Sequence, residues 1–237
     1  DGGTRFTQAY NTARCCPSRA SLLTGLHPHQ TGVGHMISDW DLDGYRGDLN
    51  DNCVTMAEVL GESGYSTYAS GKWHVTRNMD PRGPVTSWPC QRGFDRYWGM
   101  LTGAGNYFAP KFLNENNTRL DTPGEGFYFT DEISDHAAEF VRSHDRERGD
   151  DPMFLYTAYT APHWPLHALP EDIARYEGRF AAGWDTLREE RLDRMRALGL
   201  LEDHWDLTAR DERVPPWDEA AFREWEQRRM EVYAAQI

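Results

Sequence analysis

The sequence has little lysine, little cysteine and no long apolar run. Two of its 25 basic residues are lysines, and its longest apolar segments, such as 153–159, have the length of a strand. A membrane-spanning helix needs roughly 18 apolar residues, so we expect a soluble protein with no membrane partner. Acidic residues outnumber basic ones by 38 to 25, and the net charge of −13 disfavours nucleic acid as a partner. Any bound anion must therefore meet a local positive site.

The four cysteines are too few for a disulfide scaffold in a chain of 237 residues. They allow one ordinary bridge, for which Cys53 and Cys90 are the candidates. The length fits one large domain or two small ones, with enough residues for a substantial core. The chain starts without methionine and stops at Ile237 inside a helix-like run, which predicts a fragment of a longer polypeptide.

The patterns alternate between strand and helix and predict an α/β layer fold with a central mixed, mostly parallel sheet flanked by helices. A helix after Thr130, whose hydroxyl can cap it, is part of this prediction. We expect strands at 5–10, 65–70 and 153–159, the last of them buried, and helices at 17–24, 55–63, 184–198 and 222–237.

The segment 77–126 is rich in glycine, proline, asparagine and aromatic residues. It is too long for an inert connection, so we interpret it as a substrate-facing loop or insertion, in which Asn106 and Tyr107 lie where a substrate could be recognised. His27, His29 and His35 are a weak zinc candidate, because no cysteine or carboxylate at the usual spacing completes a tetrahedral site.

The first chemical motif is the segment 15–25, Cys-Cys-Pro-Ser-Arg-Ala-Ser-Leu-Leu-Thr-Gly. Proline in the first turn places Cys15 at a helix N-terminus, where free N–H groups favour an anion and lower a thiol pKa. Arg19 is unfavourable beside that helix dipole unless an anion is bound there. The alternative is a structural cysteine beside a surface arginine.

The second motif, Gly-Lys-Trp-His at 71–74, follows a predicted strand. In extended chain Lys72 and His74 project to one side, while Trp73 points into the core. The pair then offers a fixed cation and a titratable donor, although a solvated lysine and a loop histidine are the simpler interpretation.

The third motif, Ala-Pro-His-Trp-Pro at 161–165, follows the predicted strand 153–159. The two prolines restrict the backbone and hold His163 near the carboxyl end of that strand, where open α/β sheets bind ligands. His163 is therefore a candidate general acid, unless its ring only satisfies a loop carbonyl.

Together the three motifs resemble those of the sulfatase family, the formylglycine-dependent arylsulfatases of the alkaline-phosphatase-like superfamily. The segment 15–25 is similar to the family's Cys-x-Pro-Ser-Arg-x-x-x-Leu-Thr-Gly pattern, and 71–74 and 161–165 are similar to its Gly-Lys-Trp-His and Ala-Pro-His-x-Pro elements. The resemblance implies residues 1–237 to be a sulfatase N-terminal catalytic domain, truncated at both ends.

The resemblance also implies a role for each matching residue. Cys15 would be converted to formylglycine by a maturation enzyme, and one oxygen of the hydrated aldehyde would attack the sulfur of an aryl or carbohydrate sulfate ester. Arg19 would support the hydrated aldehyde, Lys72 and His74 would bind sulfate and the diol, and His163 would contact sulfate and the ester oxygen.

The family resemblance implies one Ca²⁺ ion, held in part by the modified Cys15. Its remaining ligands are expected outside the fragment, which alone would be inactive. A periplasmic or secreted location is favoured. Two other functions stay open: a phosphonate or phosphodiester hydrolase of the same superfamily, and a non-catalytic homologue that binds sulfated polymers.

Overall fold

The computed structural model describes residues 3–4 and 6–237, and the chain divides into two compact units. One unit is formed by residues 10–165 and carries the three motifs. The other is formed by residues 166–237 together with the N-terminal residues up to Ala9. The two units are described separately.

The larger unit is built on a five-stranded sheet in the order β4-β3-β2-β1-β5. β1 pairs in parallel with β2 and β5, whereas β2–β3 and β3–β4 are antiparallel. This confirms the predicted mixed α/β sheet. The strands are β1 (Ser66–Lys72), β2 (Arg96–Met100), β3 (Leu113–Glu115), β4 (Thr118–Arg119) and β5 (Met153–Ala158).

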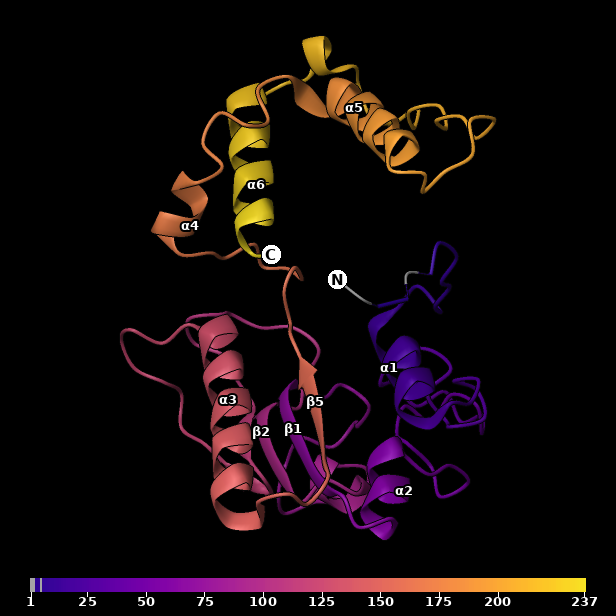
Figure 1. Ribbon diagram of the computed structural model, residues 1–237, viewed down its shortest axis with the longest axis vertical. Coiled ribbons are helices and arrows are strands. Elements are labelled where there is room, and N and C mark those ends of the chain that lie inside the picture. Colours follow the sequence, from indigo (N-terminus) through magenta and orange to yellow (C-terminus); the bar gives the residue numbers. More distant parts are fainter. Residues whose placement is uncertain (1–2, 5) are drawn as a thin grey trace. The chain divides into compact units, whose positions relative to one another are not determined.

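The sheet is covered by helices on both faces, and strand residues alternate between the two. On one face, Tyr68 of β1 stacks on Phe140 of α3 (Phe129–Arg148), and the Ser70 hydroxyl donates to a carbonyl of α3. Figure 1 shows α3 beside the strands, with α1 (Cys15–Thr24) and α2 (Met56–Glu62) on the other side. The Gly-Lys-Trp-His motif therefore lies at the end of a strand that is covered on both faces.

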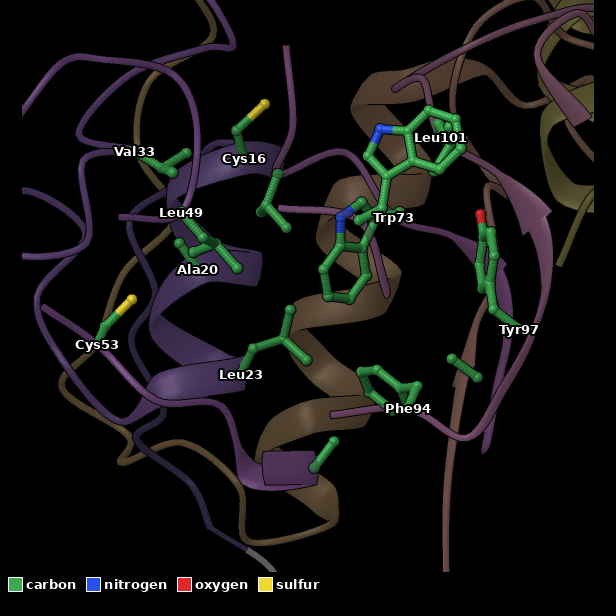
Figure 2. Close-up of a cluster of buried hydrophobic side chains, with 14 residues drawn as sticks. Cys16, Ala20, Leu23, Val33, Leu49, Cys53, Trp73, Phe94, Tyr97 and Leu101 are labelled. Carbon is green, nitrogen blue, oxygen red and sulfur yellow. The ribbon is translucent and has the colours of Figure 1, made fainter. Parts of the chain in front are cut away.

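The core between the sheet and α1 is aromatic at its centre. Cys16, Ala20 and Leu23 project from one side of α1 into it, and they meet Trp73, Phe94 and Tyr97 (Figure 2). The Trp73 and Phe94 rings contact edge to face at 5.8 Å between centroids. This packing fixes α1, and hence Cys15 at its first residue, against the end of β1.

Two glycines let the central strands approach closely near the end of β1. A Cβ on Gly99 would lie 1.8 Å from the carbonyl oxygen of Gly71, and one on Gly71 would lie 2.2 Å from that of Ala158. Gly71 also has a φ of +112°, which L side chains rarely adopt. Both positions therefore require glycine: Gly71, which directly precedes Lys72, and Gly99 on the neighbouring strand.

The smaller unit consists of short helices joined by loops. The most buried acidic residue of this unit is Glu231 of α6. Its carboxylate accepts a hydrogen bond from the Gly178 amide and forms an ion pair with Arg228. The helices are α4 (Pro170–Ala174), α5 (Gly183–Ala197) and α6 (Arg223–Ala235), and the predicted helices at 184–198 and 222–237 are confirmed within two residues. None of the described helices combines the length and apolar character that crossing a bilayer requires.

Several sequence expectations were wrong. The segment 77–126 is not a single loop, because it contains β2, β3 and β4 as well as the 3₁₀ turn η1 (Pro89–Arg92). These strands have two to five residues, which is too short for a clear alternating pattern. Arg5 lies outside the described residues, and residues 6–10 form no strand.

The bridge that the cysteines allowed and the predicted helix cap are both absent from the described chain. Cys53 and Cys90 are free thiols, and Cys53 instead lies next to the buried guanidinium of Arg92. Helix α3 begins at Phe129 without a side-chain cap, so Thr130 lies inside its first turn. The strand predicted at 153–159 is an edge strand with a half-buried pattern, because only β1 pairs with it.

Candidate active site

Cys15 is the first residue of α1 and is half-buried. The residue before it, Arg14, is the N-cap but makes no side-chain capping bond, and the first turn carries no acidic residue. The N–H groups at the end of this helix therefore meet no carboxylate from the helix itself, which favours a bound anion. The helix starts two residues earlier than predicted.

Lys72 and His74 meet Cys15 from the end of β1, as expected, but not by the expected geometry. His74 has a φ of +62°, so the chain is not extended there. The Trp73 and His74 amides still donate to the carbonyls of Met100 and Leu101, which fixes the turn. Trp73 is buried as predicted, and its indole N–H donates to the Ser87 carbonyl.

Cys15, Cys16 and His74 form one tight group. Their sulfur and ring nitrogen atoms all lie within 4.8 Å of one another. His74 is only 5% exposed, and its Nδ1 is buried without a hydrogen-bond partner in the described chain. A Cβ on Gly103 would lie 1.9 Å from Cε1 of this ring, so Gly103 borders the imidazole. Sequence reasoning missed Gly103.

The electrostatics of the group favour an anion at residue 15. A hydrogen bond from Cys16, a second from His74 and the charge of Lys72 hold the pKa of the Cys15 thiol well below its ordinary value. The Cys16 pKa is raised by the same hydrogen bond and by burial, so this thiol stays protonated. Burial and the nearby Arg19 lower the pKa of Lys72 to about 8, and burial lowers that of His74.

Arg19 crosses from α1 to the sheet edge. Its Nη1 donates to the Lys72 carbonyl at 2.8 Å and to the Tyr156 hydroxyl at 3.1 Å, and its Nη2 donates to the Tyr159 carbonyl at 3.4 Å. All three acceptors are neutral, so no carboxylate cancels its charge. Because the Tyr156 hydroxyl accepts this bond, its own proton is available to a ligand.

An open hollow of 450 Å³ lies beside Cys15 and Arg19. Its lining contains two guanidinium groups and no carboxylate, although the chain as a whole carries a charge of −13. The hollow is therefore a positive site in an acidic protein. Its lining residues are Asn11, Ala13, Arg14, Cys15, Ser18, Arg19, Leu22 and Tyr156.

His163 is exposed, and its contacts are with residues other than Cys15, Cys16 and His74. Its Nδ1 is 2.8 Å from the Trp164 carbonyl oxygen, and its own carbonyl accepts a hydrogen bond from Tyr107. Within the described chain no hydrogen bond, ion pair or ring contact joins it to Cys15, Lys72 or His74. Tyr107 is buried and positions the His163 backbone, which the sequence did not indicate.

Asn106 and two of the candidate zinc histidines have structural contacts. The Asn106 side chain accepts hydrogen bonds from the amides of Phe108 and Ala109 and so stabilises a turn. His29 is 3.0 Å from the Tyr45 hydroxyl, and His35 contacts Arg14. In the described part of the chain none of His27, His29 and His35 belongs to a group of metal-ligating side chains.

The described residues do not by themselves fit a Ca²⁺ ion. The group of possible metal ligands beside the hollow offers two sulfur atoms and one imidazole, whereas Ca²⁺ takes carboxylate and carbonyl oxygens. The surroundings of residue 15 fit a modified nucleophile better than they fit a Ca²⁺ ligand. Residue 15 is half-buried, lines the hollow and lies beside the Lys72 ammonium and the His74 imidazole.

The lowered pKa predicts selective alkylation of the unmodified chain. Iodoacetamide at pH 6 is expected to label Cys15 first, because its thiolate is already formed, whereas burial raises the pKa of Cys90 to about 11. Cys16 is fully buried and serves as the unreactive neighbour. Peptide mass spectrometry over time measures both rates, and faster labelling of Cys90 would contradict this description of the site.

Comparison with known proteins gives a consistent result. A family model described as Sulfatase matches residues 1–236. A sulfatase of Schizosaccharomyces pombe is 31% identical over 99% of this chain and 46% of its own length, and the arylsulfatase of Klebsiella aerogenes is 29% identical over 99% and 52%. The chain therefore spans about half the length of the curated relatives it matches.

Solved structures agree with the fold. The crystal structure of Ps i-CgsB is 32% identical, with a TM-score of 0.57 over 69% of this chain and 38% of that one. The sulfatase PsFucS1 of Pseudoalteromonas sp. is 19% identical, with a TM-score of 0.54 over 83% of this chain and 44% of that one, which supports the fold alone. Ps i-CgsB has also been solved in complex with k-i-k-neocarrahexaose.

Proposed function

Because the chain belongs to the sulfatase family, we propose that the protein hydrolyses sulfate esters and releases inorganic sulfate with an alcohol or phenol. The observation that carries this proposal is the position of Cys15, which opens α1 beside Lys72 and His74 and lines a hollow with no carboxylate. Such a site stabilises the negative charge on a sulfate group.

The residues of the chain divide the work as follows. Formylglycine at residue 15 would supply the nucleophilic oxygen. Lys72 would bind a sulfate oxygen through its ammonium group, and the His74 imidazole would hold the nucleophile and move its proton. Arg19, whose guanidinium is fixed by three neutral acceptors, would support residue 15 and the sulfate.

His163 would contact the sulfate and the ester oxygen, as the family resemblance implies. Its exposed ring is free to meet a ligand at Nε2 while Nδ1 is occupied by the Trp164 carbonyl. This role needs substrate to bring the ring to the nucleophile, since catalytic contacts often tighten only in the complex.

We also propose that residues 1–237 belong to an N-terminal catalytic domain and are inactive alone. Within the described residues, the group of possible metal ligands at Cys15 contains no carboxylate. The carboxylate ligands of Ca²⁺ would therefore come from another part of a longer chain. The partners would be a sulfate ester and a maturation enzyme, and the location would be periplasmic or secreted. Fractionation of cells that make the full-length protein tests the location.

The test of the function has two measurements on full-length protein made together with a maturation enzyme. Mass spectrometry of the peptide that contains Cys15 should show an aldehyde in place of the thiol. Aryl sulfate, aryl phosphonate and phosphodiester turnover should then be compared. Faster turnover of the phosphorus esters would favour the other hydrolase, and binding of sulfated polymers without any turnover would favour the non-catalytic homologue.

The lysine predicts the alkaline limit of the activity. Lys72 binds sulfate only as an ammonium, and its pKa is lowered to about 8 by burial and by Arg19. The value of kcat/KM should therefore fall as the pH rises through about 8, because the unprotonated amine carries no charge. A pH profile with an aryl sulfate measures this limb. Activity that stays constant up to pH 10 would contradict the assigned role.

A further inference from the structure

Arg14 lines the hollow together with Cys15 and Arg19, but it belongs to none of the three motifs. Arg14 directly precedes Cys15 in the chain, so its side chain leaves the backbone next to the residue proposed as the nucleophile. This closeness makes Arg14 a candidate to contact the part of the substrate that adjoins the scissile sulfate group.

The backbone before Arg14 is held by a local turn. The Asn11 side chain accepts a hydrogen bond from the Ala13 amide at 2.7 Å, and the Thr12 hydroxyl is 3.0 Å from that of Ser18 on α1. Ala13 has a φ of +55°, which costs free energy in a residue other than glycine. The turn therefore fixes the direction in which Arg14 leaves the chain.

The guanidinium of Arg14 is held by a hydrogen bond to the imidazole of His35. Nη1 of Arg14 is 3.1 Å from Nε2 of His35, and because arginine only donates, His35 accepts at this atom. The His35 ring packs against Trp40 at 4.8 Å between centroids, and Trp40 stacks on Tyr45 at 5.4 Å. Arg14 is thus positioned by a neutral, ring-supported acceptor.

The charge of Arg14 has no acidic partner in the described chain. Its one polar side-chain contact in the described chain is with His35, whereas Arg46 and Arg77 are paired with aspartates. The remaining N–H groups of Arg14 can therefore bind a ligand. A planar guanidinium of this kind binds sulfate or carboxylate with two parallel hydrogen bonds.

We infer that Arg14 is a specificity residue that binds a second anionic group of the substrate, next to the sulfate that is removed. The substrate class would then be sulfate esters that carry a second anionic group, such as a disulfated sugar. This inference rests on the proposed function. It assigns the scissile sulfate to Cys15, Lys72 and Arg19, and the second anion to Arg14.

The experiment compares a disaccharide with one sulfate and the same disaccharide with two, using matured full-length protein and measuring sulfate release. The wild type should prefer the disulfated form in kcat/KM, and Arg14→Gln should reduce that preference by about 10-fold, the effect of losing one charged hydrogen bond. Arg82→Gln is the matched control, because it removes the same charge from a side chain that is 88% exposed and pairs with Asp80.

A binding measurement separates the two proposals. Isothermal titration of the disulfated disaccharide to Cys15→Ala protein should show weaker binding when Arg14→Gln is added, whether or not turnover occurs. Equal preference in the wild type, or an unchanged preference in Arg14→Gln, would overturn the role of Arg14 while the sulfatase function stands. Binding without sulfate release by matured wild type would overturn the proposed function instead.

Discussion

Cys15→Ala in the full-length protein is expected to lower kcat for an aryl sulfate by at least about 10³-fold, because it removes the atom from which the nucleophile is made. The fold should survive the change. Cys15 is half-buried at the start of α1, where its side chain faces the hollow and helix formation does not depend on it. A stopped or continuous assay of sulfate release measures the effect.

Cys90→Ala is the matched control for this prediction. Cys90 is also a free, half-buried thiol, but its sulfur contacts Asn116 and lies outside the hollow. Its loss should leave kcat within about twofold of the wild type, as for substitutions away from a site. Retention of more than a tenth of the activity in Cys15→Ala, with normal thermal stability, would exclude residue 15 as the nucleophile.

The sequence predicted the chemistry of the site better than its shape. Pro17 and Gly25 indicated a helix with Cys15 just before its first residue, and the helix begins two residues earlier than predicted, at Cys15 itself. Gly-Lys-Trp-His indicated two polar side chains on one side of a buried tryptophan. Both motifs depend on local rules of the backbone. The left-handed turn at His74 was missed because its cause is pairing with Met100 and Leu101, far along the chain.

The strands of segment 77–126 were missed for a similar reason. Arg96–Met100 forms β2 because β1 pairs with it in parallel and β3 pairs with it on the other side. The strand contains Gly99, and a glycine inside a strand weakens the sequence pattern from which a strand is predicted. The φ of Gly99 in the structure is +154°. Tertiary contacts decided this element, and they also brought Gly103 to the His74 ring.

Gly103→Ala is expected to lower kcat by about 10²-fold although it removes no polar group from the site. The new methyl would lie 1.9 Å from Cε1 and 2.3 Å from both nitrogens of the His74 ring, so the ring must move. His74 is 5% exposed, and its own amide and that of Trp73 are both hydrogen-bonded, so the ring has little room to move. A displacement near 1 Å in a catalytic group has an effect of this size.

Gly105→Ala tests whether the effect belongs to the ring or to the loop. Its Cβ would meet the Met100 sulfur at 3.3 Å and the Pro110 Cα at 3.9 Å, which a small shift of a flexible side chain relieves. It should therefore keep kcat within about threefold of the wild type. In unmodified protein, Gly103→Ala should also raise the pKa of the Cys15 thiol, because the displaced His74 no longer donates to the thiolate. The pH dependence of Cys15 alkylation measures this pKa. An unchanged Cys15 pKa together with unchanged turnover in Gly103→Ala would show that the imidazole does not act on residue 15.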